Sequence, residues 1–367
     1  MNVAIVGAGP AGLGVARVLR DIGVPDVWVL ERGQVGQSFF DWPAGTRLLT
    51  PSFPANTFGL TDLNAISYDS SPGWSLKREH PDGAAYAQYL KQAAMVFGLD
   101  VQCGVEVSAL EPQEQGLAIS TSVGEIHANF VIWACGQFNT PSDGGIEGAT
   151  LARHYAEIPC WQSISGDEVF VVGGYESGID AAVGLASVGK RVTVLGRDAH
   201  WLMDDKDPSR ALSPYTRQRL DATLAEGQVA LVEGADVVAM EREAQGIRLF
   251  GSDGRSWLSP DAPVLATGFA SGTKQVSSWF EYDDTGLPML TPQDESTTLP
   301  GLFLVGPEVA HGDQLFCFIY KFRQRFAVVA NAIAGRLGVD TSALEVYRAC
   351  NMYLDDLTCC EDDKCFC

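Results

Sequence analysis

The stretch Gly7-Ala8-Gly9-Pro10-Ala11-Gly12 follows a short apolar run, Val3–Val6, and precedes apolar residues at helical spacing. A glycine-rich loop between a strand and a helix is the fingerprint of a dinucleotide site, because backbone N–H groups and the helix N-terminus can hold a pyrophosphate there. A second copy, Gly173-Gly174-Tyr175-Glu176-Ser177-Gly178, follows the apolar residues 169–172. The duplication predicts a chain with two dinucleotide sites.

The two copies end in opposite charges. Glu31 lies nineteen residues after the last glycine of the first copy (31 − 12 = 19), and Arg197 lies at the same offset in the second (197 − 178 = 19). A carboxylate there accepts hydrogen bonds from free ribose hydroxyls, which suits FAD or NAD. A guanidinium pairs with a phosphate through two hydrogen bonds, which suits the 2′-phosphate of NADPH. Either residue alone could simply close a strand at the surface, but the matched offset favours the nucleotide roles.

Length and charge describe an enzyme rather than a nucleic-acid or membrane protein. The chain has 367 residues, enough for two domains with their own cores, and a net charge of −21. Such an acidic surface is repelled by nucleic acid and by anionic membranes, so neither is an expected partner. The first strand is expected from residue 2 or 3, which leaves no room for a signal peptide. We therefore expect a cytoplasmic enzyme.

Repeated strand ends support two α/β domains. Ala134-Cys135-Gly136 closes a strand in the first half, and Ala266-Thr267-Gly268 closes one in matching position in the second. A later buried strand over 300–306 and a long helix over 313–336 return to the first domain in the simplest topology. The fold class predicted is α/β, with two Rossmann-like three-layer nucleotide-binding domains, the second inserted into the first. The expected domains are FAD-binding over 1–150 and 280–345, NAD(P)H-binding over 151–279, and a cysteine-rich tail over 346–367.

These motifs, in this order, resemble the flavoproteins with two dinucleotide-binding domains, a group that includes thioredoxin reductases, bacillithiol disulfide reductases and flavin-containing monooxygenases. The resemblance extends to about residue 337. It implies FAD in the first domain, NADPH in the second, and hydride transfer from nicotinamide to flavin. Proteins of this group often form dimers, so a homodimer is a further expectation.

The resemblance also implies which residues bind each cofactor. For FAD they are Gly7, Gly9, Pro10, Ala11, Gly12, Glu31, Arg32, Ser38, Trp42, Val107, Cys135, Gly136, Gly306 and Phe316. For NADPH they are Gly173, Tyr175, Glu176, Ser177, Gly178, Arg197, Thr267 and Gly268. The aromatic residues among them are equally compatible with local core packing, and Cys135 is interpreted as a packing substitution. The helix expected from Asp313 would aim its N-terminus at the flavin, with Cys317 in its first turn.

Several departures limit what can be carried over from these relatives. The sequence has no Cys-x-x-Cys, the relay of thioredoxin reductases, and it has Ala11 where bacillithiol disulfide reductases place a cysteine. The signature of flavin-containing monooxygenases, Phe-x-Gly followed by three residues and a His, is also broken. The corresponding Ile146-Glu147-Gly148 has no Phe, and His154 lies six positions after its glycine (154 − 148 = 6). Tyr175 replaces the middle glycine that lets backbone approach a pyrophosphate, which predicts weak or displaced nicotinamide binding.

The C-terminus is rich in cysteine. Five of the nine cysteines fall in residues 350–367: Cys350, Cys359, Cys360, Cys365 and Cys367. A redox arm is one interpretation, in which Cys360 pairs with Cys365 or with its neighbour Cys359. Binding of a thiophilic metal is another, although the spacing lacks paired zinc knuckles and no metal ligands are assigned. A frayed tail with incidental thiols is the third.

We therefore predict an NADPH-dependent FAD oxidoreductase that passes electrons to a disulfide or another thiol-reactive acceptor through the cysteine tail. The candidate catalytic residues are Cys359, Cys360, Cys365, Cys367 and Cys317, although burial is the more frequent fate of a lone cysteine such as Cys317. A flavin-dependent monooxygenase is the alternative within enzymes. A flavin-bearing redox or thiophilic-metal sensor is the alternative outside them.

Overall fold

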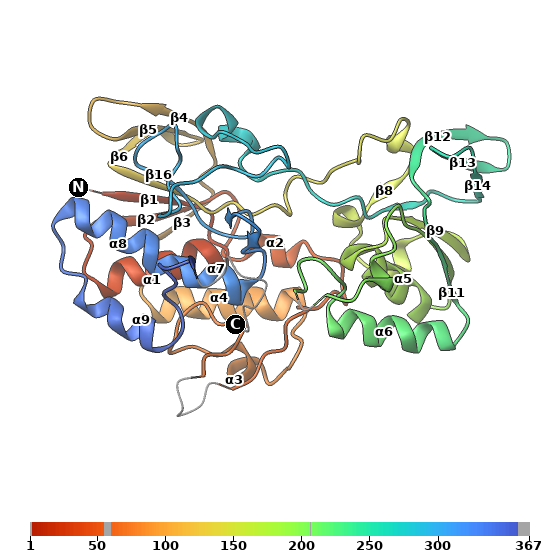
Figure 1. The fold of residues 1–367 in the computed structure, drawn as a ribbon, viewed down its shortest axis with the longest axis horizontal. Helices are drawn as coiled ribbons and strands as arrows, with labels where there is room; N and C mark the ends of the chain where they lie inside the picture. Colours follow the sequence, from red (N-terminus) through yellow and green to blue (C-terminus); the bar gives the residue numbers. More distant parts are fainter. Residues whose placement is uncertain (1, 55–59, 206, 359–367) are drawn as a thin grey trace. The chain divides into compact units, whose positions relative to one another are not determined.

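The computed structural model describes residues 2–54, 60–205 and 207–358. The chain forms two compact units (Figure 1). The first unit holds residues up to 40, residues 51–137 and residues from 271 onward, and the second holds residues 41–50 and 138–270. The long segment of the second unit begins after residue 137 and ends at residue 270, in both cases earlier in the chain than the boundaries expected at 150/151 and 279/280. The α/β class with two Rossmann-like units is confirmed.

A parallel sheet of five strands, in the order β16-β7-β1-β2-β3, forms the centre of the first unit. The strands are β1 (Val3–Val6), β2 (Val27–Glu31), β3 (Val101–Cys103), β7 (Phe130–Trp133) and β16 (Leu302–Leu304). Val3 of β1 pairs with Val27 on one side and with Phe130 on the other. The central strand is buried along its whole length, and this is why its sequence is continuously apolar rather than alternating.

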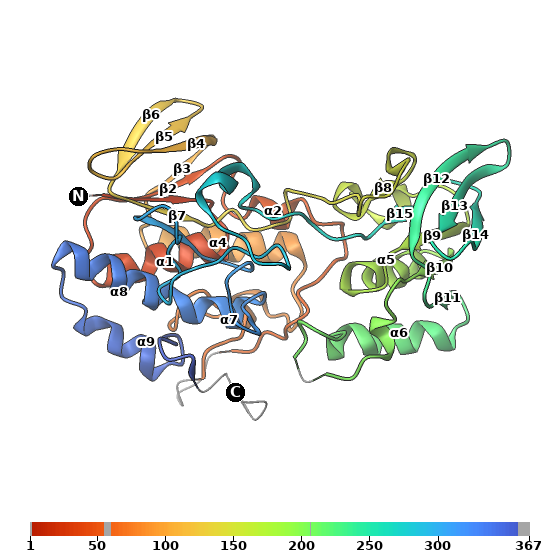
Figure 2. The same cartoon turned by 45° about the horizontal axis from the view of Figure 1, so that its top comes forward.

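Helices cover one face of this sheet and a smaller antiparallel sheet covers the other, as both views show (Figures 1 and 2). The helices are α1 (Pro10–Asp21), α4 (Gly83–Val96) and α8 (Phe326–Leu337), and the small sheet is β4 (Val107–Pro112), β5 (Leu117–Thr121) and β6 (Gly124–Ala128). A Cβ placed on Gly14 would lie 2.0 Å from the ring of Phe326, so the glycine lets α1 and α8 approach closely. The result is a three-layer unit.

The helix expected over 313–336 is wrong at its start. Residues before it form a hairpin of β17 (Ala310–His311) and β18 (Gln314–Leu315), which turns at Gly312 with φ of +55°. The helical residues begin only at α7 (Ile319–Phe322), after an extended Phe318. Cys317 therefore precedes the helix instead of lying in its first turn. The remaining elements of this unit are α2 (Gln37–Phe40), α3 (Pro72–Leu76), α9 (Glu345–Ala349) and the 3₁₀ turns η5 (Lys274–Trp279), η6 (Arg323–Arg325) and η7 (Ser342–Leu344).

The second unit repeats the same three layers. Its parallel sheet has the order β11-β10-β9-β15-β8. The strands are β8 (Arg153–His154), β9 (Glu168–Val172), β10 (Arg191–Leu195), β11 (Val229–Val232) and β15 (Val264–Leu265). The other elements are α5 (Glu176–Ser187), α6 (Pro214–Ala225), the antiparallel β12 (Val237–Glu243), β13 (Gly246–Gly251) and β14 (Ser256–Ser259), and the 3₁₀ turns η1 (Ala149–Leu151), η2 (Tyr155–Glu157), η3 (Trp161–Ser163) and η4 (His200–Leu202).

Two separate apolar cores flank the second parallel sheet. Val171 and Val194 belong to the core under α5 and α6, whereas their neighbours Val172 and Leu195 belong to the core under β12 and β13. Successive side chains of a strand point to opposite faces, so both faces of these strands must be apolar. The apolar runs that marked these strands in the sequence follow from this double burial.

The described part of the C-terminal segment, up to Thr358, is packed onto the first unit. The hydroxyl of buried Tyr347 donates to Asp21 at 2.6 Å, and Met352 is fully buried. The backbone of Leu354 is bonded on both sides, since its N–H donates to Gln324 O at 3.0 Å and its carbonyl accepts from Arg325 at 2.6 Å. Among the described residues, no helix has both the length and the apolar character needed to cross a membrane. Four predicted catalytic residues, Cys359, Cys360, Cys365 and Cys367, lie outside the described residues.

Candidate functional site

The first fingerprint is a tight turn between β1 and α1. Gly7 has φ of +107°, and a Cβ on it would lie 2.6 Å from Ala134 O; a Cβ on Gly12 would lie 1.9 Å from Gly7 O. Only glycine fits these two places. In contrast, a Cβ on Gly9 would meet no heavy atom within 4 Å. The first bond of the helical ladder runs from Leu13 N to Gly9 O, so the N–H groups of the first turn precede the ladder and remain directed at this open space.

Glu31 is fixed beside this turn by backbone hydrogen bonds. Its Oε2 accepts from Ala8 N at 2.8 Å and its Oε1 accepts from Gly33 N at 2.7 Å. These bonds orient the carboxylate at the carboxyl end of β2, and each oxygen keeps a further lone pair for a ribose hydroxyl. Arg32 points elsewhere, to Glu106 at 3.8 Å, in an exposed ion pair.

Two predicted FAD residues at the ends of neighbouring strands lie close to the fingerprint. A Cβ on Gly306, where φ is +121°, would lie 3.5 Å from the Cβ of Ala11. The thiol of Cys135 lies 3.6 Å from Val6 O, and burial raises its pKa to about 12. A thiol with that pKa is no nucleophile near neutral pH. These contacts favour a packing role for Cys135.

The other predicted FAD residues are divided between the two units. Phe316 is buried and its N–H donates to Val309 O at 3.0 Å, while Val107 begins β4 and its carbonyl accepts from Gln275. Ser38 lies in α2. Trp42 belongs to the second unit, where its ring centroid is 6.4 Å from that of Phe138.

A buried glutamate near the predicted FAD residues was not predicted from the sequence, because it belongs to no motif. Glu308 accepts from Gly272 N at 2.8 Å, and burial raises its pKa. Trp133 donates from Nε1 to Gly272 O at 2.9 Å. A Cβ on Gly272 would lie 1.7 Å from the carbonyl of Gly136, so this glycine is required by the close approach of two backbones. Lone residues such as these are invisible to motif analysis.

The second fingerprint has the backbone geometry of the first. Gly173 has φ of +114° and its Cβ would lie 2.2 Å from Ala266 O, while a Cβ on Gly178 would lie 1.9 Å from Gly173 O. Ala266 in the second unit is therefore equivalent to Ala134 in the first. Beyond it, the Thr267 hydroxyl donates to Ser142 O at 2.5 Å, and Gly268 adopts a φ of +82°. Ser177 follows in the first turn of α5.

Side chains distinguish the second fingerprint from the first. Tyr175 is the N-cap residue of α5, and its hydroxyl donates to Pro208 O at 2.8 Å and lies 3.3 Å from Ala211 O. Glu176 follows in the first helical turn, where it accepts from Ser213 N at 2.5 Å and from the Thr216 hydroxyl. Burial raises the pKa of Glu176. A carboxylate therefore already lies at the positive end of this helix.

The segment after β10 folds back over this fingerprint. We call residues 198–205 and 207–213 the strap. Its Trp201 is buried against two glycines, because a Cβ on Gly174 or on Gly196 would lie 2.3 or 2.5 Å from the Trp201 ring. Arg197, immediately before the strap, is 73% exposed, and its Nε donates to Asp198 at 3.1 Å. An exposed guanidinium at this place is available to a phosphate.

A buried polar cluster of the second unit centres on Asp180, two residues after Gly178. Its Oδ2 accepts from the Thr46 hydroxyl at 2.8 Å and from the Tyr155 hydroxyl at 2.9 Å, and its Oδ1 accepts from Arg219 at 2.7 Å. Thr46 comes from residues 41–50, which explains why that segment leaves the first unit. No local sequence pattern predicts this contact, because Thr46 and Asp180 are 134 residues apart in the chain.

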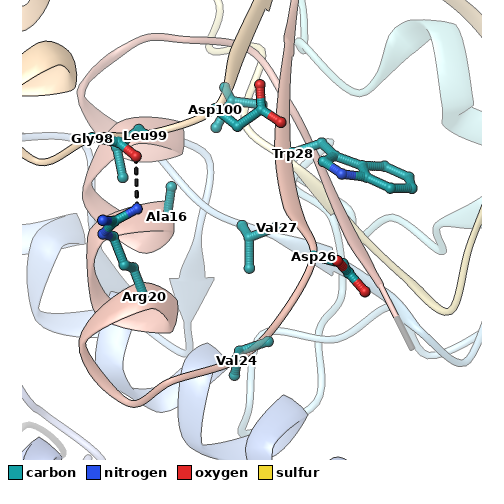
Figure 3. Close-up of a pocket in the computed structure, with 10 residues that line it drawn as sticks. Ala16, Arg20, Val24, Asp26, Val27, Trp28, Gly98, Leu99 and Asp100 are labelled. Atoms are coloured by element: carbon teal, nitrogen blue, oxygen red, sulfur yellow. Dashed lines mark hydrogen bonds between the residues drawn. The ribbon is translucent and has the colours of Figure 1, made fainter.

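A pocket of the first unit lies away from its fingerprint (Figure 3). Its lining comes from the end of α1, the start of β2 and residues 98–100, with Arg20 donating to Gly98 O at 2.7 Å. Ligands of parallel α/β sheets bind at the carboxyl ends of the strands. This pocket is at the amino end of β2, so we assign it no cofactor.

The chain was compared with known proteins. A family model described as pyridine nucleotide-disulphide oxidoreductase matches residues 4–306. The chain belongs to this family. Among its relatives, bacilliredoxin reductase Bdr of Bacillus subtilis (strain 168) is 24% identical over 336 residues, covering 90% of this chain and 97% of that protein. A ferredoxin–NADP reductase of Gluconacetobacter diazotrophicus is 26% identical over 354 residues, covering 93% of each.

Solved structures share the fold. Bacillithiol disulfide reductase Bdr (YpdA) from Staphylococcus aureus superposes with a TM-score of 0.74 at 20% identity, covering 92% of this chain and 98% of that one. The predicted family and the assignment as an oxidoreductase are confirmed by these matches. The family match also agrees with the predicted cofactor pair, FAD and NADPH.

Proposed function

We propose that this protein is an NADPH-dependent FAD oxidoreductase that reduces a disulfide, with FAD in the first unit and NADPH in the second. The observation that carries the proposal is the pair of matched glycine turns, at Gly7 and Gly173, followed at equal offsets by a carboxylate and a guanidinium. The turns supply the anion sites and the charged side chains distinguish the nucleotides.

The first cradle fits FAD. The open space at Gly9 leaves room for a pyrophosphate against the first turn of α1, and Glu31 is oriented to accept from ribose hydroxyls. Gly306 and Phe316 are two further first-unit residues expected near the flavin. When bound there, FAD would supply two-electron redox chemistry between NADPH and an acceptor.

The second cradle fits NADPH in its backbone and in one side chain. Arg197 is exposed just after β10. There its guanidinium would exchange its ion pair with Asp198 for one with the 2′-phosphate. Tyr175 and Glu176 are the residues that fit least well, since they fill the N-terminus of α5.

A disulfide acceptor is supported by the cysteine-rich terminus and by the resemblance to a protein named bacilliredoxin reductase. The overall reaction is NADPH + H⁺ + RSSR → NADP⁺ + 2 RSH. In this proposal a thiol pair of Cys359, Cys360, Cys365 and Cys367 relays two electrons by thiol–disulfide exchange, with Cys317 as a further exchange partner. The backbone of Leu354, shortly before these cysteines in the chain, is hydrogen-bonded to Gln324 and Arg325 of the first unit.

Direct transfer to an iron–sulfur protein is the second candidate. It is favoured by the resemblance to a ferredoxin–NADP reductase and by the absence of Cys-x-x-Cys from the sequence. Such a reaction needs no cysteine. Removing the tail therefore separates the two candidates.

The test is an anaerobic NADPH titration of the flavin-loaded protein with free thiols counted, comparing wild type with a protein truncated after Thr358. Truncation further upstream would remove buried Met352 and the paired Leu354 and would disturb the fold. Replacing the exposed Cys103 by serine is the matched control for loss of an unrelated thiol.

We expect wild type and the control to consume two electrons beyond those that reduce FAD, and the truncated protein to lose that excess. Equal consumption by all three would remove the relay and favour the second candidate. A protein that stays yellow under NADPH would overturn the proposal as a whole. A homodimer is also proposed, and light scattering of the same samples measures it.

A further inference from the structure

The second fingerprint is covered where the first is open. At the middle position of the motif, a Cβ on Gly9 would meet no heavy atom within 4 Å, but the equivalent Tyr175 fills that place with a ring 4.5 Å from the imidazole of His200. The middle glycine is the one that allows a pyrophosphate to approach backbone. In the second unit this approach is blocked by a side chain and by the strap that it contacts.

The strap is attached to the fingerprint at three points. At the first point, the Tyr175 hydroxyl donates to Pro208 O at 2.8 Å and lies 3.3 Å from Ala211 O. At the second, Trp201 packs on Gly174 and Gly196. At the third, Glu176 accepts from the backbone N–H of Ser213. Every attachment uses a residue of the glycine loop or the residue directly after β10, so strap and loop form one closed arrangement.

This closed arrangement is also unfavourable to anions. The first turn of α5 contains the carboxylate of Glu176, whereas the first turn of α1 contains no acidic residue. The described residues of the strap include four aspartates, Asp198, Asp204, Asp205 and Asp207, against one arginine, Arg210. A pyrophosphate brought to this helix end would meet like charge at short range and would compete for the same helix dipole.

We propose that Tyr175 and the strap gate the second dinucleotide site, so that NADPH reaches the N-terminus of α5 only after the Tyr175 hydroxyl has released the carbonyls of Pro208 and Ala211. The inference rests on the proposed function, since it takes the second unit as the NADPH site. Because the closed state excludes ligand, the apparent affinity is lowered by the fraction of protein that is closed. Tyr175 is in this sense a residue that sets cofactor affinity without taking part in hydride transfer.

The test uses Tyr175→Phe in the flavin-loaded protein, with 2′,5′-ADP as the probe ligand in calorimetric titrations. Loss of one neutral hydrogen bond that holds the closed state should tighten probe binding about fivefold. The KM for NADPH should fall by the same factor. Tyr282→Phe is the matched control, since it removes one hydroxyl contact, with Thr273 at 2.7 Å, in the first unit. Unchanged or weaker binding by Tyr175→Phe would overturn the gate.

Hydrogen–deuterium exchange of the strap supplies a second readout that is independent of turnover. Binding of 2′,5′-ADP should increase exchange at the Ser213 amide, because opening breaks its bond to Glu176; slower exchange would contradict the gate. Tyr175→Gly should bind the probe at least as tightly as Tyr175→Phe. If neither wild type nor any variant binds the probe, the placement of NADPH in the second unit fails. If all bind it equally, that placement stands and the gate alone fails.

Discussion

The two glycine turns of this protein have the same backbone and different neighbours. Gly7 and Gly173 both have φ above +100° and both approach the carbonyl of an alanine at the end of the adjacent strand. The first turn faces open space, whereas the second faces Tyr175, Trp201 and the rest of the strap. The outer glycines of the motif are therefore required by packing of strand against helix, while the residue at the middle position determines whether a ligand can approach from outside.

The largest effect is expected from adding one methyl group at the last glycine of each turn. A Cβ at Gly12 or at Gly178 would lie 1.9 Å from a backbone carbonyl, so neither site can accept alanine without moving the helix. Gly12→Ala should lower the FAD-to-protein ratio at least tenfold, because it distorts the open cradle. Gly178→Ala should leave FAD bound and abolish its reduction by NADPH.

Absorbance of the purified variants and anaerobic mixing with NADPH measure both quantities. Gly335→Ala, on α8, is the control, since a Cβ there meets no heavy atom within 4 Å. Loss of flavin from Gly178→Ala would break the assignment of one cofactor to each turn.

The next effect concerns the charge that distinguishes the two nucleotides. Arg197→Gln should raise the KM for NADPH about ten- to a hundredfold and leave the KM for NADH unchanged, because charge-assisted bonds to a phosphate are worth about 1.5–3 kcal/mol. Steady-state kinetics with both nucleotides give the ratio. Arg191→Gln is the control, since Arg191 is a similarly exposed arginine at the start of β10, paired with Glu168 as Arg197 is with Asp198. A parallel rise for NADH would contradict the role of Arg197.

A smaller effect is expected where the second unit depends on residues 41–50. Thr46→Val keeps the shape of the side chain but removes a hydrogen bond to the buried carboxylate of Asp180. The free energy of unfolding in urea should fall by about 1–3 kcal/mol. Thr193→Val, a half-buried position on β10, is the control. Equal stability of the Thr46 variant and wild type would mean that this contact does not hold the segment in place.

The smallest effect is expected at the middle residue of the tripeptide that ends a strand in equivalent position in each unit. Cys135 occupies in the first unit the position that Thr267 occupies in the second. Cys135→Thr should leave the FAD content unchanged and should change the free energy of unfolding by less than about 0.5 kcal/mol.

The thiol of Cys135 should also be unreactive. Because burial raises its pKa to about 12, the thiol stays protonated at pH 8 and should resist alkylation in the native protein. Mass spectrometry after labelling checks this. Rapid labelling of Cys135 would show that it is reactive.

Local sequence signals predicted the regular parts of both units. The turns at Gly7 and Gly173, the apolar strands beside them and the late buried strand within 300–306 depend on short-range pattern, and each lies close to its predicted place. The helix expected from Asp313 failed because the glycine at 312 turns a hairpin that no periodicity reveals. Long-range contacts were equally hidden: Thr46 meets Asp180 across 134 positions, and the strap meets Tyr175 through its own carbonyls.

The path of residues 41–50 has a consequence for how this protein can be divided. Residues 138–270 are continuous in the chain, yet they lack Thr46, whose hydroxyl bonds the buried Asp180. A fragment cut at those limits would keep Tyr155 and Arg219 but lose one of the donors to that carboxylate. A chimaera made by exchanging residues 138–270 with a relative would combine Asp180 or its replacement with a foreign residue 46. Any autonomous version of the second unit must therefore also carry the segment 41–50.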